Sequence, residues 1–346
     1  PMQAAIITGT NQLELQSFPD PDPIGAQGIV VEIRYCGICG SDVHAWPHGG
    51  PYPAALCGHE WGGVVSKAAS DVRRVREGDR VCVSVLPPCG ACAECRAGHE
   101  HWCVTAMNSL GGGDPCGSRH GGFAPSIAVS EARVAPVPDA MSDEAAAQVE
   151  PATVAYHGVR RSGLRLGDYT VVQGAGPIGL FTLQWARAAG AGELIVIEGS
   201  PVRAELARSL GATRVCAPGE EAAELVQEST GGLGADVVFE CVGRPETIQT
   251  AIGLARRGGA LMIIGLSDRD ASITPGILLS KELRVDASIA YHHTEFERAM
   301  AMIVDGRVRA DLSTRKVGFA GLEDAIAELA AGDAKDAKIL FDPRAG

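Results

Sequence analysis

The chain of 346 residues lacks several features that would direct it to a membrane or to nucleic acid. It has no run of about 18 consecutive apolar residues, which is the length that a membrane-spanning helix requires. Its first residues, PMQAAIITGTNQLEL, show no basic stretch followed by an apolar one, so we expect no secretory signal and a cytoplasmic location. It also lacks an excess of basic residues, and its net charge of −12 argues against a nucleic-acid partner.

Cysteine is abundant instead, and its distribution is informative. The chain has 11 cysteines, an odd number, and most of them lie in the first third of the sequence. A disulfide framework is typical of small secreted domains, whereas clustered cysteines in a long chain without a signal are more often metal ligands. We therefore expect metal sites and no disulfide framework.

The densest cluster has the spacing Cys89-x2-Cys92-x2-Cys95-x7-Cys103, in a segment bounded by proline and glycine. Four thiolates at short spacing provide the closed tetrahedral shell of a structural zinc ion. Iron–sulfur clusters also use four cysteines, but usually with other spacings. Free buried thiols and a redox relay are the remaining alternatives, and the spacing argues against both.

The pattern of expected strands and helices changes at Glu150. Before it, short strand-like runs such as GIVVEIRY, EWGGVVSKA, DRVCVSV and EARVAPVP are separated by turn residues, as in a β-rich domain. After it, strand and helix patterns alternate, which predicts a parallel α/β sheet. We expect helices to end at Gly190, Gly211 and Gly258 and another to begin at the capping box Thr294–Glu297.

A glycine motif lies in this second part, between an expected strand and an expected helix. It reads Gly174-Ala-Gly176-Pro177-Ile178-Gly179. Such a turn binds a dinucleotide pyrophosphate, because its glycines permit the tight turn and the close approach of the phosphates to the helix N-terminus. Glu198 ends the next strand, where a carboxylate accepts hydrogen bonds from the adenosine ribose. Its charge favours NAD over NADP, although Arg203 lies nearby.

A second group of metal-ligand residues is dispersed along the first domain. Cys39 lies in Cys36-Gly-Ile-Cys39-Gly-Ser41-Asp42-Val-His44, and His59 and Glu60 follow Gly58. A catalytic zinc needs about three protein ligands and one open position. Cys39 and His59 would provide two, and Glu60 and Glu150 are the carboxylate candidates for the third.

Together these residues resemble the zinc-containing medium-chain alcohol dehydrogenases. The motifs GICGSDVH, GHE, the four cysteines and GAGPIG span nearly the whole chain, and Val149-Glu150-Pro151 resembles the sorbitol, threonine and butanediol dehydrogenase branch. The resemblance implies an α/β protein with a GroES-like β-rich catalytic domain, residues 1–150 and 291–346, which carries the structural-zinc lobe 89–103. It also implies a Rossmann domain with a doubly wound parallel sheet, residues 151–290, and an active site in the cleft between the domains.

The resemblance also implies roles for single residues. Cys39 and His59 match the family's zinc ligands, and Ser41 and His44 match its proton relay. We expect Glu150 to complete the zinc shell, with Glu60 close enough to exchange with it or to take the ligand position while Glu150 hydrogen-bonds the zinc-bound water.

For the cofactor, Gly265 and Leu266 match the segment beside the nicotinamide, and Lys338 falls near a basic residue that contacts the pyrophosphate in some members. The expected function is hydride transfer between a small secondary alcohol, diol or polyol and NAD, with two zinc ions per subunit in a homotetramer or homodimer.

Two rival functions remain at this stage. A zinc-free quinone or enoyl reductase of the same fold typically lacks Cys39, His59 and the cysteine lobe, which are present here. A non-catalytic zinc and NAD(H)-binding redox sensor would not need Ser41 and His44 beside the ligands. The substrate itself is not readable from the sequence.

Overall fold

The computed structural model describes residues 1–49, 51–332 and 335–345, and its contacts divide the chain into two units. Unit 1 contains Pro1–Glu150, His292–Val304 and Ala310–Gly346, and unit 2 contains Pro151–Tyr291 and Asp305–Arg309. The sequence-based boundaries were 150/151 and 290/291. The assignment of a catalytic role to the first unit and a cofactor role to the second stays a prediction.

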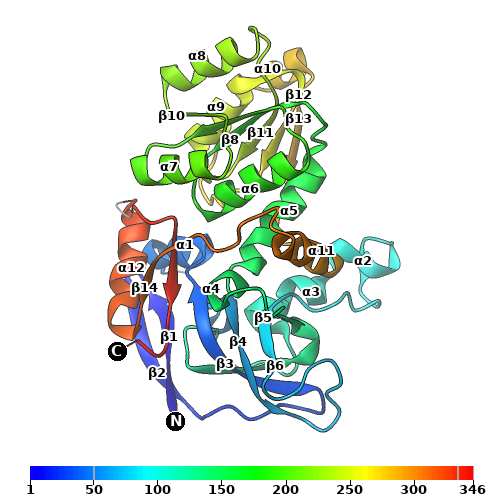
Figure 1. Ribbon diagram of the computed structural model, residues 1–346, viewed down its shortest axis with the longest axis vertical. Helices are drawn as coiled ribbons and strands as arrows, with labels where there is room; N and C mark the ends of the chain where they lie inside the picture. Colours follow the sequence, from blue (N-terminus) through cyan, green and yellow to red (C-terminus); the bar gives the residue numbers. More distant parts are fainter. Residues whose placement is uncertain (50, 333–334, 346) are drawn as a thin grey trace. The chain divides into compact units, whose positions relative to one another are not determined.

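Unit 2 is built on a six-stranded sheet in which every neighbouring pair is parallel (Figure 1). Its strand order is β10 (Arg214–Cys216), β9 (Glu193–Ile197), β8 (Tyr169–Gln173), β11 (Ala235–Glu240), β12 (Ala255–Ile263), β13 (Arg284–Ala287). The strand order reverses beside β8, which is the crevice where doubly wound sheets bind dinucleotides. The central strands are buried, as the apolar runs YTVVQ and ADVVFE predict.

Helices cover both faces of this sheet (Figure 1). One face carries α6 (Pro177–Ala188) and α7 (Pro201–Ser209), and the other carries α8 (Glu220–Ser229), α9 (Pro245–Leu254) and α10 (Pro275–Lys281). Gly190 and Gly211 follow their helices with positive φ, as expected. The expectation for Gly258 is wrong: α9 ends at Leu254 and Gly258 lies inside β12. The helix ends early because Ala255 already pairs with Ala235 of β11.

Unit 1 is a β-structure whose main sheet combines both ends of the chain. The sheet order is β14 (Ser313–Val317), β15 (Lys338–Phe341), β3 (Gly28–Gly37), β4 (Glu60–Ala68), β5 (Arg80–Val83), β7 (Val134–Pro136), with β6 (Ser126–Ser130) also paired to β3. A hairpin of β1 (Met2–Gly9) and β2 (Gln12–Phe18) forms a separate sheet. In the core of unit 1, the side chains of Trp61, Phe123 and Phe341 are almost fully buried.

Short helices connect these strands and position the side chains discussed below. They are α1 (Gly40–His48), η1 (Ala54–Leu56), α2 (Ala93–Arg96), η2 (Glu100–Trp102), α3 (Val104–Asn108), η3 (Ser109–Gly113), η4 (Glu131–Arg133), α4 (Asp143–Ala146), α11 (His293–Val304) and α12 (Phe319–Ala331). Another helix, α5 (Val149–Ser162), belongs mostly to unit 2. The capping box at Thr294 is wrong by two residues: α11 begins at His293, and Glu295 accepts a hydrogen bond from the backbone N–H of His292. Among the described residues, no helix has the length and apolar character needed to cross a membrane.

Candidate active site

The four cysteines of the predicted zinc lobe converge. The sulfur atoms of Cys89, Cys92, Cys95 and Cys103 all lie within 4.8 Å of one another. The tight loop Cys89–Cys92, the short helix α2 that carries Cys95, and the start of α3 after Cys103 bring them together. Four sulfurs at this separation fit the tetrahedral shell of one zinc ion.

Backbone N–H groups already favour thiolate in this lobe. The N–H groups of Ala91 and Cys92 donate to the sulfur of Cys89 at 3.4 and 3.3 Å. These hydrogen bonds, with that of Ala91 the largest cause, lower the pKa of Cys89 to about 6. Burial, followed by hydrogen bonds with the neighbouring thiols, raises the pKa of Cys95 to about 12. None of the 11 cysteines, all of which the structure describes, forms a disulfide.

The second predicted site also forms, with Glu60 as its carboxylate. One ligand atom each of Cys39, His59 and Glu60 lies within 4.8 Å of the others. Cys39 is the N-cap of α1, His59 ends the loop after η1, and Glu60 is the first residue of β4. One thiolate, one imidazole and one carboxylate make three ligands, the number that leaves one position open on a catalytic zinc.

The imidazole of His59 is oriented for binding a metal ion. Its Nδ1 lies 2.8 Å from the carbonyl oxygen of Leu56, to which it donates, so Nε2 keeps its lone pair for a metal. Burial alone would lower the pKa of His59, but the charges of Cys39, Asp42 and Glu150 raise it well above its usual value. The surrounding negative potential is what a divalent cation would neutralise.

A hydrogen-bond network that sequence reasoning missed lies beside this group. Asp42 is fully buried and accepts from the hydroxyl of Tyr52 at 2.9 Å and from the backbone N–H of Cys39 at 3.1 Å. Ser41 Oγ lies 3.3 Å from the Tyr52 hydroxyl and 3.4 Å from His59 Nε2. Burial raises the pKa of Asp42. Asp42 therefore anchors the start of α1, and the hydroxyl of Ser41 faces the candidate metal group.

Ser41 and His44 share one face of α1. They are three residues apart, the spacing that makes helical side chains neighbours. The ring of His44 packs against that of His48, with centroids 4.9 Å apart. The structure thus places both predicted relay residues on the helix that begins at Cys39.

Glu60 has a second partner that the sequence did not reveal. Lys338 of β15 donates to Glu60 Oε2 and, at 2.8 Å, to the carbonyl oxygen of Ile38. Both side chains are 2% exposed, and this burial makes the ion pair sensitive to the loss of either partner. Gly37 leaves room for the pair, because a Cβ there would stand 2.2 Å from Glu60 Oε2. The cofactor role expected for Lys338 stays a prediction.

Glu150 is the second residue of α5 and is buried. Its charge contributes to the raised pKa of His59, so its carboxylate belongs to the electrostatic surroundings of the site. It is outside the group of ligand atoms within 4.8 Å, which contains Glu60 instead. Direct ligation by Glu150 stays a prediction.

The glycine motif forms the expected turn between β8 and α6. Gly174 has φ of 86°, Gly176 is the N-cap of α6, and Pro177 is its first residue, followed by Ile178. A Cβ on Gly179 would stand 1.8 Å from the carbonyl oxygen of Gly174, so only glycine fits. A Cβ on Gly176 would meet no atom within 4 Å, which leaves its backbone open to a ligand.

Glu198 reaches across to this turn. Its Oε2 accepts from Ala175 N at 2.8 Å, and its Oε1 accepts from Ser200 N at 2.7 Å and from Arg203 at 3.1 Å. Arg203 therefore partly offsets the charge that Glu198 presents beside the turn.

Gly265 and Leu266 follow β12 at the same carboxyl edge of the sheet. Gly265 N donates to the carbonyl oxygen of Glu240 at 2.9 Å. Glu240, which sequence reasoning missed, accepts from Val242 N at 2.9 Å and Gly243 N at 2.8 Å through Oε1. This buried carboxylate holds the turn after β11 against Gly265.

Comparison with known proteins agrees with this geometry. The family described as alcohol dehydrogenase GroES-like domain matches residues 25–139, and the family described as zinc-binding dehydrogenase matches residues 177–305. The probable D-xylulose reductase A of Aspergillus terreus is 32% identical, over 94% of this chain and 94% of that protein. The chain belongs to the zinc-binding dehydrogenase family.

Solved structures of this dehydrogenase family superpose on the whole chain. The 2R,3R-butanediol dehydrogenase of Bacillus subtilis has a TM-score of 0.82 and 29% identity, and covers 99% of this chain and 100% of its own. A dehydrogenase of the zinc-binding type from Sinorhizobium meliloti 1021, bound to NADP, has a TM-score of 0.84 and 30% identity, with 99% of each chain covered. The predicted family, its GroES-like and Rossmann fold, and its oxidoreductase class are confirmed.

Proposed function

We propose that this dehydrogenase transfers a hydride between a small secondary alcohol, diol or polyol and NAD. The observation that carries the proposal is the position of Ser41 Oγ, 3.4 Å from His59 Nε2 in a group that also contains Cys39 and Glu60. A hydroxyl that faces a three-ligand metal group can accept the proton that leaves an alcohol. A metal site with a purely structural role does not require a hydroxyl at this position.

Cys39, His59 and Glu60 hold the catalytic zinc in this proposal, and Cys89, Cys92, Cys95 and Cys103 hold the structural one. When bound, the catalytic zinc supplies Lewis-acid polarisation of the substrate oxygen. Ser41 Oγ accepts the hydroxyl proton and passes it towards His44, while the contact of Tyr52 with Ser41 fixes the Ser41 side chain. Glu150 contributes negative charge beside His59 and is available to the open position.

The cofactor is proposed to be NAD, bound at the turn Gly174–Gly179. When bound, its nicotinamide supplies the hydride acceptor. Glu198 would accept hydrogen bonds from the ribose hydroxyls and repel a 2′-phosphate. Two observations weaken this preference: Arg203 pairs with Glu198 at 3.1 Å, and the similar Sinorhizobium meliloti protein was solved with NADP. Glu198 keeps one carboxylate oxygen away from Arg203, which supports NAD.

The substrate is proposed to carry a second hydroxyl next to the reacting one. The similar proteins include a D-xylulose reductase and a butanediol dehydrogenase, both of which act on such compounds by name. A carboxylate in the metal group, here Glu60, makes the site harder than a purely sulfur and nitrogen shell, which suits oxygen-rich ligands.

The protein is further proposed to act in the cytoplasm as a homotetramer or homodimer. The thiol-rich lobe needs a reducing compartment to hold a metal. For assembly, β13 is an edge strand with all four residues exposed, and Leu279 and Ile289 near it are 80% and 70% exposed. An exposed edge strand with apolar neighbours is suited to pairing with a second copy.

Purified protein with measured zinc content tests the proposal. NAD and NADP reduction is followed with secondary alcohols, vicinal diols, polyols and amino alcohols, before and after chelation of the metal. We expect zinc-dependent turnover, highest with vicinal diols or polyols and with NAD. Absence of turnover with every alcohol would support the sensor alternative, and turnover that survives complete zinc removal would support the zinc-free reductase. A preference for NADP would contradict the role of Glu198 alone.

A further inference from the structure

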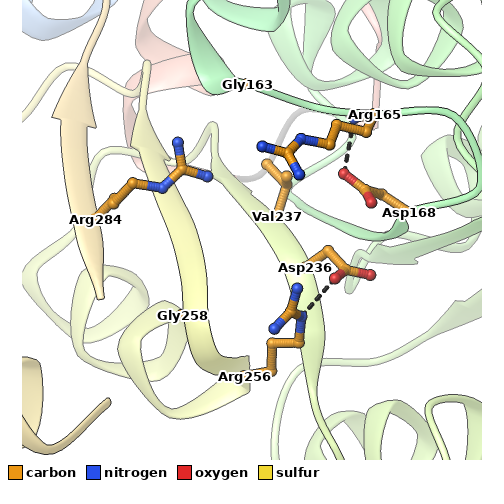
Figure 2. A pocket seen from close by; sticks show the side chains of 8 residues that line it. All are labelled: Gly163, Arg165, Asp168, Asp236, Val237, Arg256, Gly258 and Arg284. Atoms are coloured by element: carbon orange, nitrogen blue, oxygen red, sulfur yellow. Dashed lines mark hydrogen bonds and ion pairs between the residues drawn. The ribbon is translucent and has the colours of Figure 1, made fainter. Parts of the chain in front are cut away.

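Unit 2 has a cavity at the edge of its sheet opposite the glycine turn (Figure 2). Its volume is about 320 Å³, and it is lined by Gly163, Arg165, Asp168, Asp236, Val237, Arg256, Gly258 and Arg284. Asp168 precedes β8, and Asp236, Arg256 and Arg284 lie at the beginnings of β11, β12 and β13. Because these strands are parallel, the cavity lies at their amino ends, whereas Gly174 follows the carboxyl end of β8.

The two carboxylates of the cavity are engaged within the protein. Asp236 accepts from Arg256 Nε and, at 2.8 Å, from the backbone N–H of Tyr169. Asp168 accepts from the backbone N–H of Arg165 at 2.7 Å. Arg256 is therefore paired with Asp236, whereas Asp168 contributes one negative charge to the cavity, because a backbone N–H does not neutralise a carboxylate.

Two guanidinium groups of the cavity, those of the exposed residues Arg165 and Arg284, are the candidates for binding an anion. Figure 2 shows the side chains of Arg165 and Arg284 pointing toward one another from opposite sides of the cavity, above Val237. Within the described part of the chain, no carboxylate pairs with either guanidinium group. Three arginines and two aspartates line the cavity, so its formal charge is +1 and it attracts an anion.

The backbone makes room for this arrangement. Gly163 lies beside Arg284, and a Cβ on Gly163 would stand 3.1 Å from its Nη1 and 3.6 Å from its Nη2. The φ of Gly163 is 75°, a conformation that glycine adopts without strain. Glycine at this position thus leaves the fork of Arg284 unobstructed toward the cavity.

We propose that this cavity binds the phosphate group of a small phosphate monoester, with Arg165 and Arg284 as its ligands. The planar guanidinium fork matches two oxygens of a phosphate, and the positive formal charge of the cavity favours an anion. The volume of about 320 Å³ accommodates a phosphate with a small organic group, since ligand pockets begin at about 300 Å³. The site lies away from the glycine turn, so it can be filled together with a dinucleotide.

Isothermal titration calorimetry of the full chain tests the proposal. The probes are inorganic phosphate, glycerol 3-phosphate and, as a dicarboxylate of similar charge, malonate, each titrated with NAD present in excess to occupy the glycine turn. We expect glycerol 3-phosphate to bind best and malonate to bind weakest. Arg165→Gln and Arg284→Gln should each weaken glycerol 3-phosphate binding by about tenfold or more, because each removes a charge-assisted hydrogen-bonding partner.

Arg257→Gln is the matched control. It removes one positive charge next to Arg256 from an exposed residue that does not line the cavity, so binding should change less than about twofold. Arg284→Lys, which keeps the charge but loses the fork, should give an intermediate affinity.

Each contrary result overturns the proposal. Equal weakening by Arg257→Gln would mean general electrostatic attraction, and equal binding of malonate would mean a carboxylate site. Binding that both cavity variants leave unchanged would place the phosphate elsewhere, and the absence of binding by any probe would leave two hydrated surface arginines. Circular dichroism of each variant confirms that the fold is retained.

Discussion

The two candidate metal-binding groups of unit 1 are built in opposite ways. The lobe of Cys89, Cys92, Cys95 and Cys103 takes four identical ligands from 15 consecutive residues, whereas Cys39, His59 and Glu60 come from a helix cap, a loop and a strand. The first group is complete in itself. The second depends on a network that also includes Asp42, Tyr52 and Lys338.

The first arrangement suits a structural role, and the second suits a catalytic one. Four thiolates close the shell of a metal and leave no position for a substrate. Three mixed ligands leave one position open, and the hydroxyl of Ser41 lies beside them. The predictions below test whether loss of the first group costs the fold and loss of the second costs only the reaction.

The largest effect is expected from Cys95→Ser, which opens the four-thiolate shell. Structural zinc contributes about 10–16 kcal/mol in zinc-finger peptides, as much as the whole stability of many domains. We expect the zinc content to fall from two to one per chain and the protein to unfold or aggregate, measured by metal analysis and thermal unfolding. Cys116→Ala, a buried cysteine outside both groups, is the control. Normal stability with two zinc ions in the Cys95 variant would contradict the structural role.

Cys39→Ala is expected to impair the reaction and to leave the fold intact. Loss of Lewis-acid polarisation removes several kcal/mol of transition-state stabilisation, so kcat should fall by about 10³-fold or more. The thermal midpoint and NAD affinity should stay close to those of the wild type. Unfolding as severe as that of the Cys95 variant would break the comparison, since both groups would then be structural.

Lys338→Met tests the ion pair that supports the second group. It leaves the charge of Glu60 buried without its partner, and breaking a buried pair costs about 3–5 kcal/mol. Chemical denaturation should show this loss, and a Glu60→Gln/Lys338→Met double variant should recover part of it. If the single variant is as stable as the wild type, Glu60 does not depend on Lys338.

Ser41→Ala removes the hydroxyl nearest to His59. A general acid–base group contributes about 10²–10⁴-fold, so the loss should fall on kcat and alter its pH profile while KM changes little. Tyr52→Phe removes only a neighbour of that hydroxyl and should have a smaller effect on kcat. An unchanged rate and pH profile for Ser41→Ala, with chemistry rate-limiting, would exclude Ser41 from proton transfer.

The smallest effect concerns acid stability and a histidine that belongs to neither group. Burial lowers the pKa of His120, which packs against Phe18 with ring centroids 4.9 Å apart. His120 therefore stays neutral in the folded protein while it is protonated in the unfolded chain, so stability falls as the pH drops below about 6.5. One such proton contributes at most about 1.4 kcal/mol per pH unit. His120→Gln should reduce this slope in denaturation curves from pH 7 to 5, and an unchanged slope would assign the acid sensitivity to the metal ligands.

The contrast between the groups also explains what the sequence could predict. The cysteine lobe and the glycine turn are local, so spacing alone identified Cys103 and Gly179 as members of their sites. The pairing of Lys338 with Glu60 joins residues 278 positions apart, and no periodicity connects them. Tyr52 was missed for a related reason, since its contact with Asp42 depends on how the loop before η1 folds back onto α1.

Element boundaries failed where strand pairing or capping overrode a local signal. Gly258 resembled a helix end, but the pairing of Ala255 with Ala235 ends α9 earlier. Glu295, rather than Glu297, accepts from the backbone N–H of His292, which directly precedes α11. The fold class survived these errors because it depends on the alternation of whole elements, which single residues do not change.

Because β15 lies between β14 and β3 and is the last strand of the chain, the main sheet of unit 1 is completed only at the end of synthesis. Glu60 is synthesised early, and Lys338 follows 278 residues later, after both segments of unit 2. At about 5–20 residues per second this interval is roughly 15–55 s. The four cysteines, in contrast, leave the exit tunnel almost together. The four sulfur atoms can therefore come together during translation, whereas Glu60 gains its partner Lys338 only when the last strand has been made.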